Sequence, residues 1–428
     1  MKKIILCGIT LALLSFSSCE SDEKPLIVFT CSDGIKNGDE TGIDCGGSCE
    51  PCIGTVDVSG FITQNTIWTS NNIYILKGKV VVDDGIILTI EPGTIIKGME
   101  GTGSLASALI IARGGKLMAE GNENEPIIMT SVKDNIEVGQ TEGSNLNETN
   151  VGLWGGLIVL GKAQGSFSGD VSEVQIEGIP ASDTFGLYGG SENDDNSGIL
   201  KYISIRHGGT EIGEGNEING LTLGAVGSAT IIENIEVVAN FDDGIEFFGG
   251  TVNCKNLLVW AQGDDGLDID QAYSGTISNA FVILGDISDH ALEIDGPEGS
   301  LEGQFTLNNI TLYGNPNTPD GEYADYRSHA MGTSNNIYAY GFSASSDIEL
   351  DNDAVAQNYN DDKLIFGLWE IVLPNGVDDV KTLFKNKAEN VIVTDFGDNT
   401  TAVIQGNQTV GADLSVFDWT YANSKSAY

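Results

Sequence analysis

The sequence has few basic residues. It contains 20 Lys and Arg residues against 62 Asp and Glu residues, a formal net charge of −42 at pH 7, and only three His residues. Nucleic acid and anionic lipid surfaces would be repelled by such a chain, so we expect no nucleic-acid partner. Polyanionic glycans are disfavoured too, unless calcium bridges them. No HExxH motif and no Gly-rich phosphate loop between a strand and a helix is present, which argues against a zinc protease or a nucleotide-binding enzyme.

Long apolar runs are also missing. The apolar stretch at residues 4–14 follows Met1-Lys-Lys and is too short to span a bilayer, so it is interpreted as a secretory signal over residues 1–18. The small residues before Cys19 resemble a bacterial lipobox, which implies lipidation of Cys19. The acidic stretch after it, within a tether at 19–30, is similar to the signal that sends Bacteroidota lipoproteins to the outer face of the outer membrane. The alternative is a tether whose charge only keeps it soluble.

Cysteine is used sparingly outside one short segment. Cys7 leaves with the signal, and Cys254 is expected to be a small buried hydrophobe in a strand. The other four form a dense cluster in an exported protein, which predicts two disulfides with three possible pairings. A four-cysteine zinc site is the alternative. The cluster consists of Cys31, Cys45, Cys49 and Cys52.

The segment from Cys31 to Cys52, which reads Cys-Ser-Asp-Gly-Ile-Lys-Asn-Gly-Asp-Glu-Thr-Gly-Ile-Asp-Cys in its first part, resembles a small module at the start of many secreted and surface proteins. We therefore assign residues 31–54 to a disulfide-rich module that acts as a spacer. Its acidic and amide side chains could bind calcium or could simply belong to a turn-rich loop. These side chains are Asp33, Asn37, Asp39, Glu40 and Asp44.

The remainder of the chain is repetitive. Four similar segments begin at residues 219, 243, 265 and 290, with spacings of 22 to 25 residues, and the second of them reads Asp243-Gly-Ile-Glu-Phe. A period of this length predicts stacked coils that bury their apolar faces against their neighbours. A second ladder of strands begins with Asn234, Asn256, Asn279, Asn309 and Asn336.

Asparagine at a fixed turn position can bond to the next asparagine and tolerates the left-handed corner that such a turn needs. The two ladders in fixed register therefore predict an all-β, right-handed parallel β-helix. An antiparallel sandwich is the alternative, but it would require two-residue hairpin turns.

The β-helix is expected over residues 55–343, and 344–428 should form an irregular, β-rich C-terminal cap because the period is lost there. This cap is also expected to fold back over outward-facing apolar residues such as Leu258 and Phe281. Motifs such as Leu88-Thr-Ile-Glu-Pro-Gly and Asp242-Asp-Gly-Ile-Glu-Phe-Phe-Gly-Gly resemble a family of uncharacterised Bacteroidota β-helix lipoproteins. That resemblance implies a fold and a location but no reaction.

Carboxylates should line the outer face of the repeated strands. Period-two alternation places Ile245 and Phe247 inside and Glu246 outside. The same rule in neighbouring coils gives the predicted metal ligands Glu246, Asp268, Asp270, Glu293 and Asp295, with Asp243, Asp265 and His290 at the adjacent corner. Basic residues are expected to be scarce near these columns. Calcium binding, a solvated acidic face and an enzyme site are the three interpretations.

The enzyme interpretation depends on Gly263-Asp-Asp-Gly266, which resembles the paired-aspartate motif of β-helix polygalacturonases. In that case Asp243, Asp265, Asp268 and Asp270 would serve as acids and bases, with His207 next to Arg206 as an additional base. A structural corner pair is the alternative for Arg206 and His207.

Aromatic residues recur four positions after the coil asparagine, at Trp260, Tyr313 and Tyr340. They form either a platform on which sugars stack or an apolar surface under the C-terminal cap. The sequence therefore predicts a lipid-anchored β-helix protein on the cell exterior that uses calcium and binds a polysaccharide in glycan recognition or adhesion. A glycoside hydrolase or polysaccharide lyase is the alternative, followed by a structural envelope protein without a ligand.

Overall fold

The computed structural model describes residues 30–50, 52–180, 182–212, 217–318 and 321–428 of the 428-residue chain. The predicted signal peptide, Cys19 and nearly all of the acidic tether lie outside these residues. The chain divides into two compact units, Met1–Cys52 and Ile53–Tyr428. Each unit is described separately below.

The first unit is held together by two disulfides, Cys31–Cys49 and Cys45–Cys52. The prediction of two disulfides is confirmed, the pairing is decided, and the zinc alternative is wrong because no free thiolate is left in the cluster. Asp44 accepts hydrogen bonds from the backbone N–H groups of Asp33 and Gly34, at 2.8 and 3.0 Å. The acidic side chain therefore organises a turn, as expected of the turn-rich alternative.

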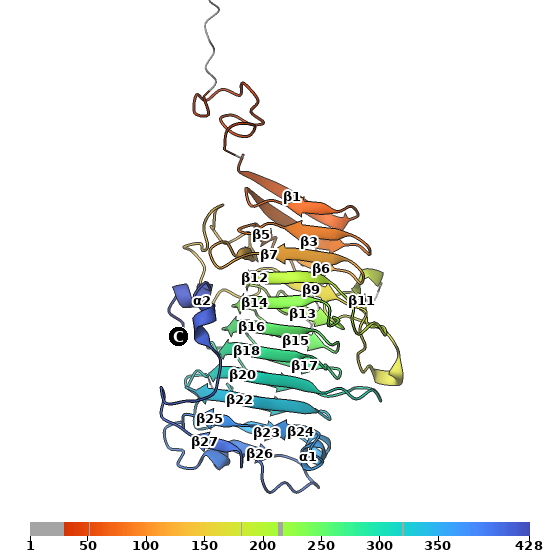
Figure 1. The fold of residues 1–428 in the computed structure, drawn as a ribbon, viewed down its shortest axis with the longest axis vertical. Helices are drawn as coiled ribbons and strands as arrows, with labels where there is room; N and C mark the ends of the chain where they lie inside the picture. Colours follow the sequence, from red (N-terminus) through yellow and green to blue (C-terminus); the bar gives the residue numbers. More distant parts are fainter. Residues whose placement is uncertain (1–29, 51, 181, 213–216, 319–320) are drawn as a thin grey trace, which may run out of the picture. The chain divides into compact units, whose positions relative to one another are not determined.

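The second unit is a right-handed parallel β-helix (Figure 1), and the predicted fold class is confirmed. Within the described residues one sheet joins 25 strands, and every pairing in it is parallel. The first coils contain β1 (Gly54–Ile62), β2 (Thr66–Trp68), β3 (Asn72–Val82), β4 (Ile87–Ile90), β5 (Ile95–Gly98), β6 (Ala108–Ile111), β7 (Lys116–Glu120), β8 (Ile127–Ser131) and β9 (Leu157–Leu160).

Each later coil consists of a long strand, a corner and a short strand. The long strands are β12 (Gly198–Arg206), β14 (Ile231–Val238), β16 (Asn253–Trp260), β18 (Thr276–Ile283), β20 (Phe305–Tyr313) and β22 (Gly332–Tyr340). The short strands are β13 (Leu221–Gly224), β15 (Ile245–Phe248), β17 (Leu267–Asp270), β19 (Leu292–Ile294), β21 (Ala324–Tyr326), β23 (Ile348–Leu350) and β26 (Phe384–Asn386).

The asparagine ladder bends the long strands. All five predicted asparagines have positive φ, between 56° and 60°. Asn256 donates a side-chain hydrogen bond to Asn234 at 2.8 Å, Asn279 donates to Asn256 at 2.9 Å, and Asn336 donates to Asn309 at 3.1 Å. This prediction is confirmed: asparagine accepts the left-handed conformation at low cost and satisfies its amide against the next coil.

The coils continue past the predicted boundary at residue 343. The strands β24 (Leu364–Phe366), β25 (Trp369–Ile371), β26 and β27 (Thr400–Ala402) pair in parallel with the coils above them, and α1 (Asp353–Asn360) packs Val355 and Ala356 into the same core. The predicted end of the β-helix is too early in the chain. These last coils differ in length, so the sequence shows no regular period there.

The irregular C-terminal part is shorter than predicted and starts after β27. We call residues 403–428 the C-terminal strap; it includes the short helix α2 (Tyr421–Ser424), which lies beside the long strands in Figure 1. Phe417 and Tyr421 of the strap pack on Leu258 and Phe281. The expected fold-back over these outward apolar residues is therefore present in the structure.

A long insertion covers another part of the β-helix. Residues 161–197 include the antiparallel pair β10 (Val174–Gln175) and β11 (Leu187–Tyr188). Phe167 and Tyr188 of this insertion pack on Phe248, which points outward from β15. In the described part of the chain, no helix is long and apolar enough to cross a membrane.

Candidate functional site: two columns of carboxylates

The outward face of the short strands carries a continuous column of carboxylates. Glu246, Asp268, Glu293, Asp325 and Glu349 are register partners in successive coils. Their neighbours Ile245 and Phe247 are fully buried in the core, as the period-two pattern predicts. The column is longer than expected, since Asp325 and Glu349 belong to coils without the Asp-Gly corner. The alternation in Tyr323-Ala-Asp-Tyr326 was the signal that could have revealed the first of them.

A second column lies at the corner before each short strand. The backbone N–H of Asp265 donates to Asp243 at 2.9 Å, and the backbone N–H of His290 donates to Asp265 at 2.8 Å. Each corner carboxylate thus accepts a hydrogen bond from the next coil. Asn219 occupies the corner one coil earlier, and its side-chain amide donates to Glu246.

The glycine after the first three corner residues is required by close packing, whereas Ala291 follows the corner residue His290. A Cβ at Gly220, Gly244 or Gly266 would lie 2.3 to 2.4 Å from the side chain of a long-strand valine. No other residue fits without moving the corner. The repeated Asx-Gly pattern therefore keeps the corner carboxylates at a constant position against the sheet.

Asp243, Glu246 and Asp268 form a buried carboxylate cluster, in which one oxygen of each side chain lies within 4.8 Å of the others. These residues are 7%, 4% and 8% exposed. Burial, and then the charges of neighbouring carboxylates, raise the pKa of all three side chains well above the usual range. No Lys, Arg or His forms an ion pair with them among the described residues, and Oδ1 of Asp268 has no hydrogen-bond partner there.

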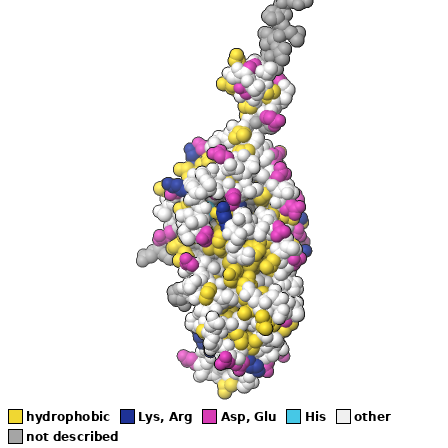
Figure 2. All heavy atoms as spheres, turned by 90° about the vertical axis from the view of Figure 1, so that its left-hand side faces the viewer, with side chains coloured by type: hydrophobic (Ala, Val, Ile, Leu, Met, Phe, Trp, Pro, Cys, Tyr) yellow, Lys and Arg dark blue, Asp and Glu magenta, His cyan; other side chains and the backbone are white. Residues whose placement is uncertain are grey.

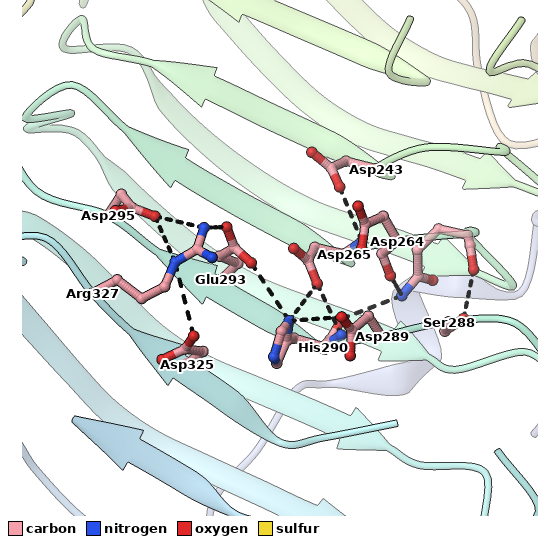
Figure 3. Close-up of polar contacts among 11 residues, drawn as sticks. Asp243, Asp264, Asp265, Ser288, Asp289, His290, Glu293, Asp295, Asp325 and Arg327 are labelled. Carbon is pink, nitrogen blue, oxygen red and sulfur yellow. Dashed lines mark hydrogen bonds and ion pairs between the residues drawn. The ribbon is translucent and has the colours of Figure 1, made fainter. Parts of the chain in front are cut away.

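Cations neutralise the columns further along the helix (Figure 3). His290 lies among Asp265, Asp289 and Glu293, with Nδ1 2.8, 3.8 and 3.5 Å from their oxygens. Arg327 is enclosed by a further set of carboxylates. Its Nε donates to Asp295 at 2.9 Å and lies 3.8 Å from Asp325, and the guanidinium also pairs with Glu293.

Lys387 pairs with Glu349 in the last coil of the column. The prediction that basic residues are scarce near the columns is therefore wrong for the C-terminal coils of the columns. Arg327 and Lys387 come from corners that follow short strands in coils where the repeat was not recognised.

The predicted metal ligands do not converge on one point. Glu246 and Asp268 join Asp243 in the buried cluster, whereas Glu293 belongs with Asp265 and His290. Asp295 is engaged by Arg327.

Asp270 lies two residues after Asp268, on the same face of the strand. Burial and the nearby charges of Asp295 and Glu298 raise its pKa to about 7. The structure thus divides the predicted set into an unneutralised cluster and a part held by cations.

The comparison with protein families agrees with this architecture. Residues 60–423 match the family model described as a pectate-lyase like beta helix domain. The chain belongs to this family. No curated protein and no solved structure matches the chain.

In this pectate-lyase-like β-helix, Arg206 and His207 stand apart from the carboxylate columns. His207 is 1% exposed, and its Nδ1 lies 2.8 Å from the backbone oxygen of Asn150. Burial lowers its pKa to about 4. Arg206 is buried beneath Tyr421, with the guanidinium carbon 4.4 Å from the ring centre, and it pairs with Glu236. None of these interactions reaches the columns, and the contacts are those of a structural corner pair.

The aromatic residues of this pectate-lyase-like β-helix do share one outward column, which Ile283 interrupts. Trp260 is 8% exposed and packs against Tyr421 of the C-terminal strap. Its ring is therefore covered rather than open to a sugar. Tyr313 and Tyr340 are half-buried and stack on each other with ring centres 4.5 Å apart.

Proposed function

We propose that the protein is an exported polysaccharide-binding β-helix that binds a divalent cation, calcium by preference, at the buried carboxylate cluster. The proposal depends mainly on one observation: Asp243, Glu246 and Asp268 lie together, and no Lys, Arg or His in the described part of the chain pairs with them. Three buried like charges are unfavourable unless they take up protons or a cation. The unpartnered Oδ1 of Asp268 is a donor atom that such a cation would use.

The donor set suits calcium. Carboxylate and amide oxygens are hard ligands, and Oδ1 of the buried Asn219 also lacks a hydrogen-bond partner in the part of the chain that the structure describes. Asn219 already contacts Glu246 through its amide nitrogen. When bound, the cation would neutralise the cluster and could also bridge an acidic glycan to a protein with a net charge of −42. Without such a bridge, the negative charge of the protein would repel an acidic polysaccharide.

The test is calorimetric titration of calcium into chelator-treated protein. We expect saturable binding that is weakened at least about tenfold in Asp268→Asn, which keeps the shape of the side chain but removes its charge. The matched control is Asp57→Asn, since Asp57 is exposed and pairs with Lys77 at 2.5 Å. Absence of binding, or equal affinity in Asp268→Asn, would refute the proposal.

A second candidate, a polysaccharide lyase, is favoured by the family match together with the position of Arg327 beside the columns. A lyase transfers the proton next to the uronate carboxyl to a base and forms a carbon–carbon double bond as the bond to the glycosidic oxygen breaks, and that oxygen then takes up a proton. The expected signature is ultraviolet absorbance of the unsaturated product in calcium-containing buffer, lost in Arg327→Lys. If calcium binds but no unsaturated product forms from a uronate polysaccharide panel, the protein is a binding protein rather than a lyase.

We further propose that the chain is anchored to the outer membrane through a lipid on Cys19 and faces the cell exterior. The support is the sequence pattern around Cys19. Metabolic labelling with a fatty acid should modify the wild type but not Cys19→Ser, and protease treatment of intact cells should degrade the β-helix. Survival of the protein in intact cells would contradict the exterior location.

A further inference from the structure

The C-terminal strap and the outer face of the long strands β20 and β22 border a half-open cavity of about 240 Å³. Its walls come from two sources. The strands β20 and β22 supply Thr311, Tyr338 and Tyr340, and the strap supplies Gln405, Gly406, Gln408, Val410, Ala412 and Leu414. None of the residues that line the cavity carries a charge. Figure 2 views this flank and shows hydrophobic side chains gathered along its middle, with Asp and Glu mainly toward the margins.

The strap is fixed along this face by hydrogen bonds from its backbone to outward side chains of the coils. The N–H of Thr409 donates to Glu370 at 2.5 Å, and the N–H of Ala412 donates to Thr311 at 2.8 Å. Further along, the N–H of Ala422 donates to Glu236 at 2.8 Å. The cavity is therefore formed before any ligand arrives, which reduces the ordering cost of binding.

Gly411 allows the strap to approach the tyrosines closely. Its φ is +110°, and a Cβ there would lie 2.8 Å from both Thr311 Oγ1 and Tyr338 Cβ. Only glycine fits this position without displacing the strap. The close approach closes one side of the cavity and buries Tyr338, which is 4% exposed.

Among the described residues, one buried hydroxyl at the cavity lacks a hydrogen bond of normal geometry. The hydroxyl of Tyr338 lies near the backbone of Gly406 but makes no hydrogen bond of normal geometry among the described residues. A buried hydroxyl without a well-formed hydrogen bond is costly, so it favours a ligand that supplies one. The amides of Gln405 and Gln408 lie on exposed loop residues at the same cavity and offer further neutral donors and acceptors.

We propose that this cavity is a binding site for a neutral sugar of about one ring, distinct from the cation site and independent of it. Uncharged amide and hydroxyl groups match the hydroxyls of a sugar, and the apolar wall of Val410, Ala412 and Leu414 matches its C–H face. The volume is below the range of sites for drug-sized ligands, which suits a single residue of a glycan. The net charge of the protein disfavours an anionic sugar here, because none of the acidic clusters found among the described residues lines the cavity.

The experiment is saturation-transfer NMR of the full-length protein with glucose, galactose, mannose, xylose and N-acetylglucosamine, each titrated to obtain a Kd. We expect at least one of these sugars to bind, with affinity reduced at least about tenfold in Tyr338→Phe, which removes only the unpartnered hydroxyl. Gln405→Ala, on an exposed loop, should also weaken binding while leaving the thermal midpoint unchanged. The matched control is Tyr359→Phe, whose hydroxyl donates to Asp395 at 3.2 Å away from the cavity.

Chelation separates this site from the proposed cation site. Binding should persist in excess chelator, because no lining residue is a carboxylate. If none of the five sugars binds, or if Tyr338→Phe and Gln405→Ala bind as tightly as the wild type, the proposal is overturned. It is also overturned if binding vanishes on chelation, a result that would instead assign the sugar to the carboxylate columns.

Discussion

Oδ1 of Asp265 accepts two hydrogen bonds from His290, one from the backbone N–H and one from Nδ1, both at 2.8 Å. The two residues occupy the same corner position in adjacent coils, so the contact joins the coils through backbone and side chain at once. Burial alone would lower the pKa of His290. The hydrogen bond with Asp265 and the charges of Asp265 and Asp289 outweigh burial and raise the pKa to about 9.

This relationship predicts a loss of stability in alkaline solution. Because the folded-state pKa of His290 is above its unfolded value of about 6.5, the contribution of the imidazolium is complete below that pH and is lost as pH rises through about 9. Thermal unfolding measured from pH 6 to pH 10 should show this decline. His290→Gln should be less stable at pH 6 and should lose less on going to pH 10; equal slopes for the two proteins would contradict the prediction.

The carboxylates predict a second pH effect, at lower pH. Burial and the charges of Asp295 and Glu298 raise the pKa of Asp270 to about 7, above its unfolded value of about 3.9. Its proton stabilises the folded state fully below pH 4, and this contribution is lost as pH rises toward 7. In chelator, Asp270→Asn should flatten the stability profile between pH 4 and pH 7 relative to the wild type. The free energy of unfolding can be measured at each pH by urea denaturation. If it changed with pH equally in Asp270→Asn and in the wild type, the prediction would be contradicted.

The asparagine ladder predicts a measurable cost for one side chain. Asn256 donates to Asn234, accepts from Asn279 and has a φ of +57°. Asn256→Ala should lower the free energy of unfolding by about 1–3 kcal/mol, since it removes both hydrogen bonds and places alanine in a left-handed conformation.

Asn256→Gly is the matched control for this substitution because it tolerates the same φ, and it should cost less than alanine. Chemical denaturation of the two variants checks the prediction. A larger loss for glycine than for alanine would mean that φ is not a significant part of the cost.

The C-terminal strap predicts a local effect of one aromatic residue. Phe417 is fully buried, and its ring centre lies 6.4 Å from that of Phe281. Phe417→Ala should weaken strap docking by about 3–5 kcal/mol through the lost burial and the cavity left behind. We expect faster proteolysis of residues 403–428 and increased binding of a hydrophobic dye. Phe241→Ala, at a residue that is 47% exposed, should do neither; unchanged proteolysis in Phe417→Ala would contradict the prediction.

The sequence by itself determined the β-helix, the asparagine ladder and the outward direction of Glu246, Asp268 and Glu293. These features follow from local rules: strand side chains alternate, asparagine accepts positive φ, and each coil repeats the turn before it. The repeat failed as a guide where coil length changed, and Asp325, Arg327 and Lys387 were missed for that reason.

Only the tertiary structure decided which carboxylates are buried together and which are neutralised. The insertion at 161–197 that packs on Phe248, and the strap that packs on Trp260 and Tyr338, come from distant parts of the chain without a period. Cation placement depends on the same long-range geometry, because Arg327 reaches Glu293 and Asp295 one coil away. Burial and ion pairing depend on all residues that are close in space. A sequence repeat identifies only those contacts that recur once per coil.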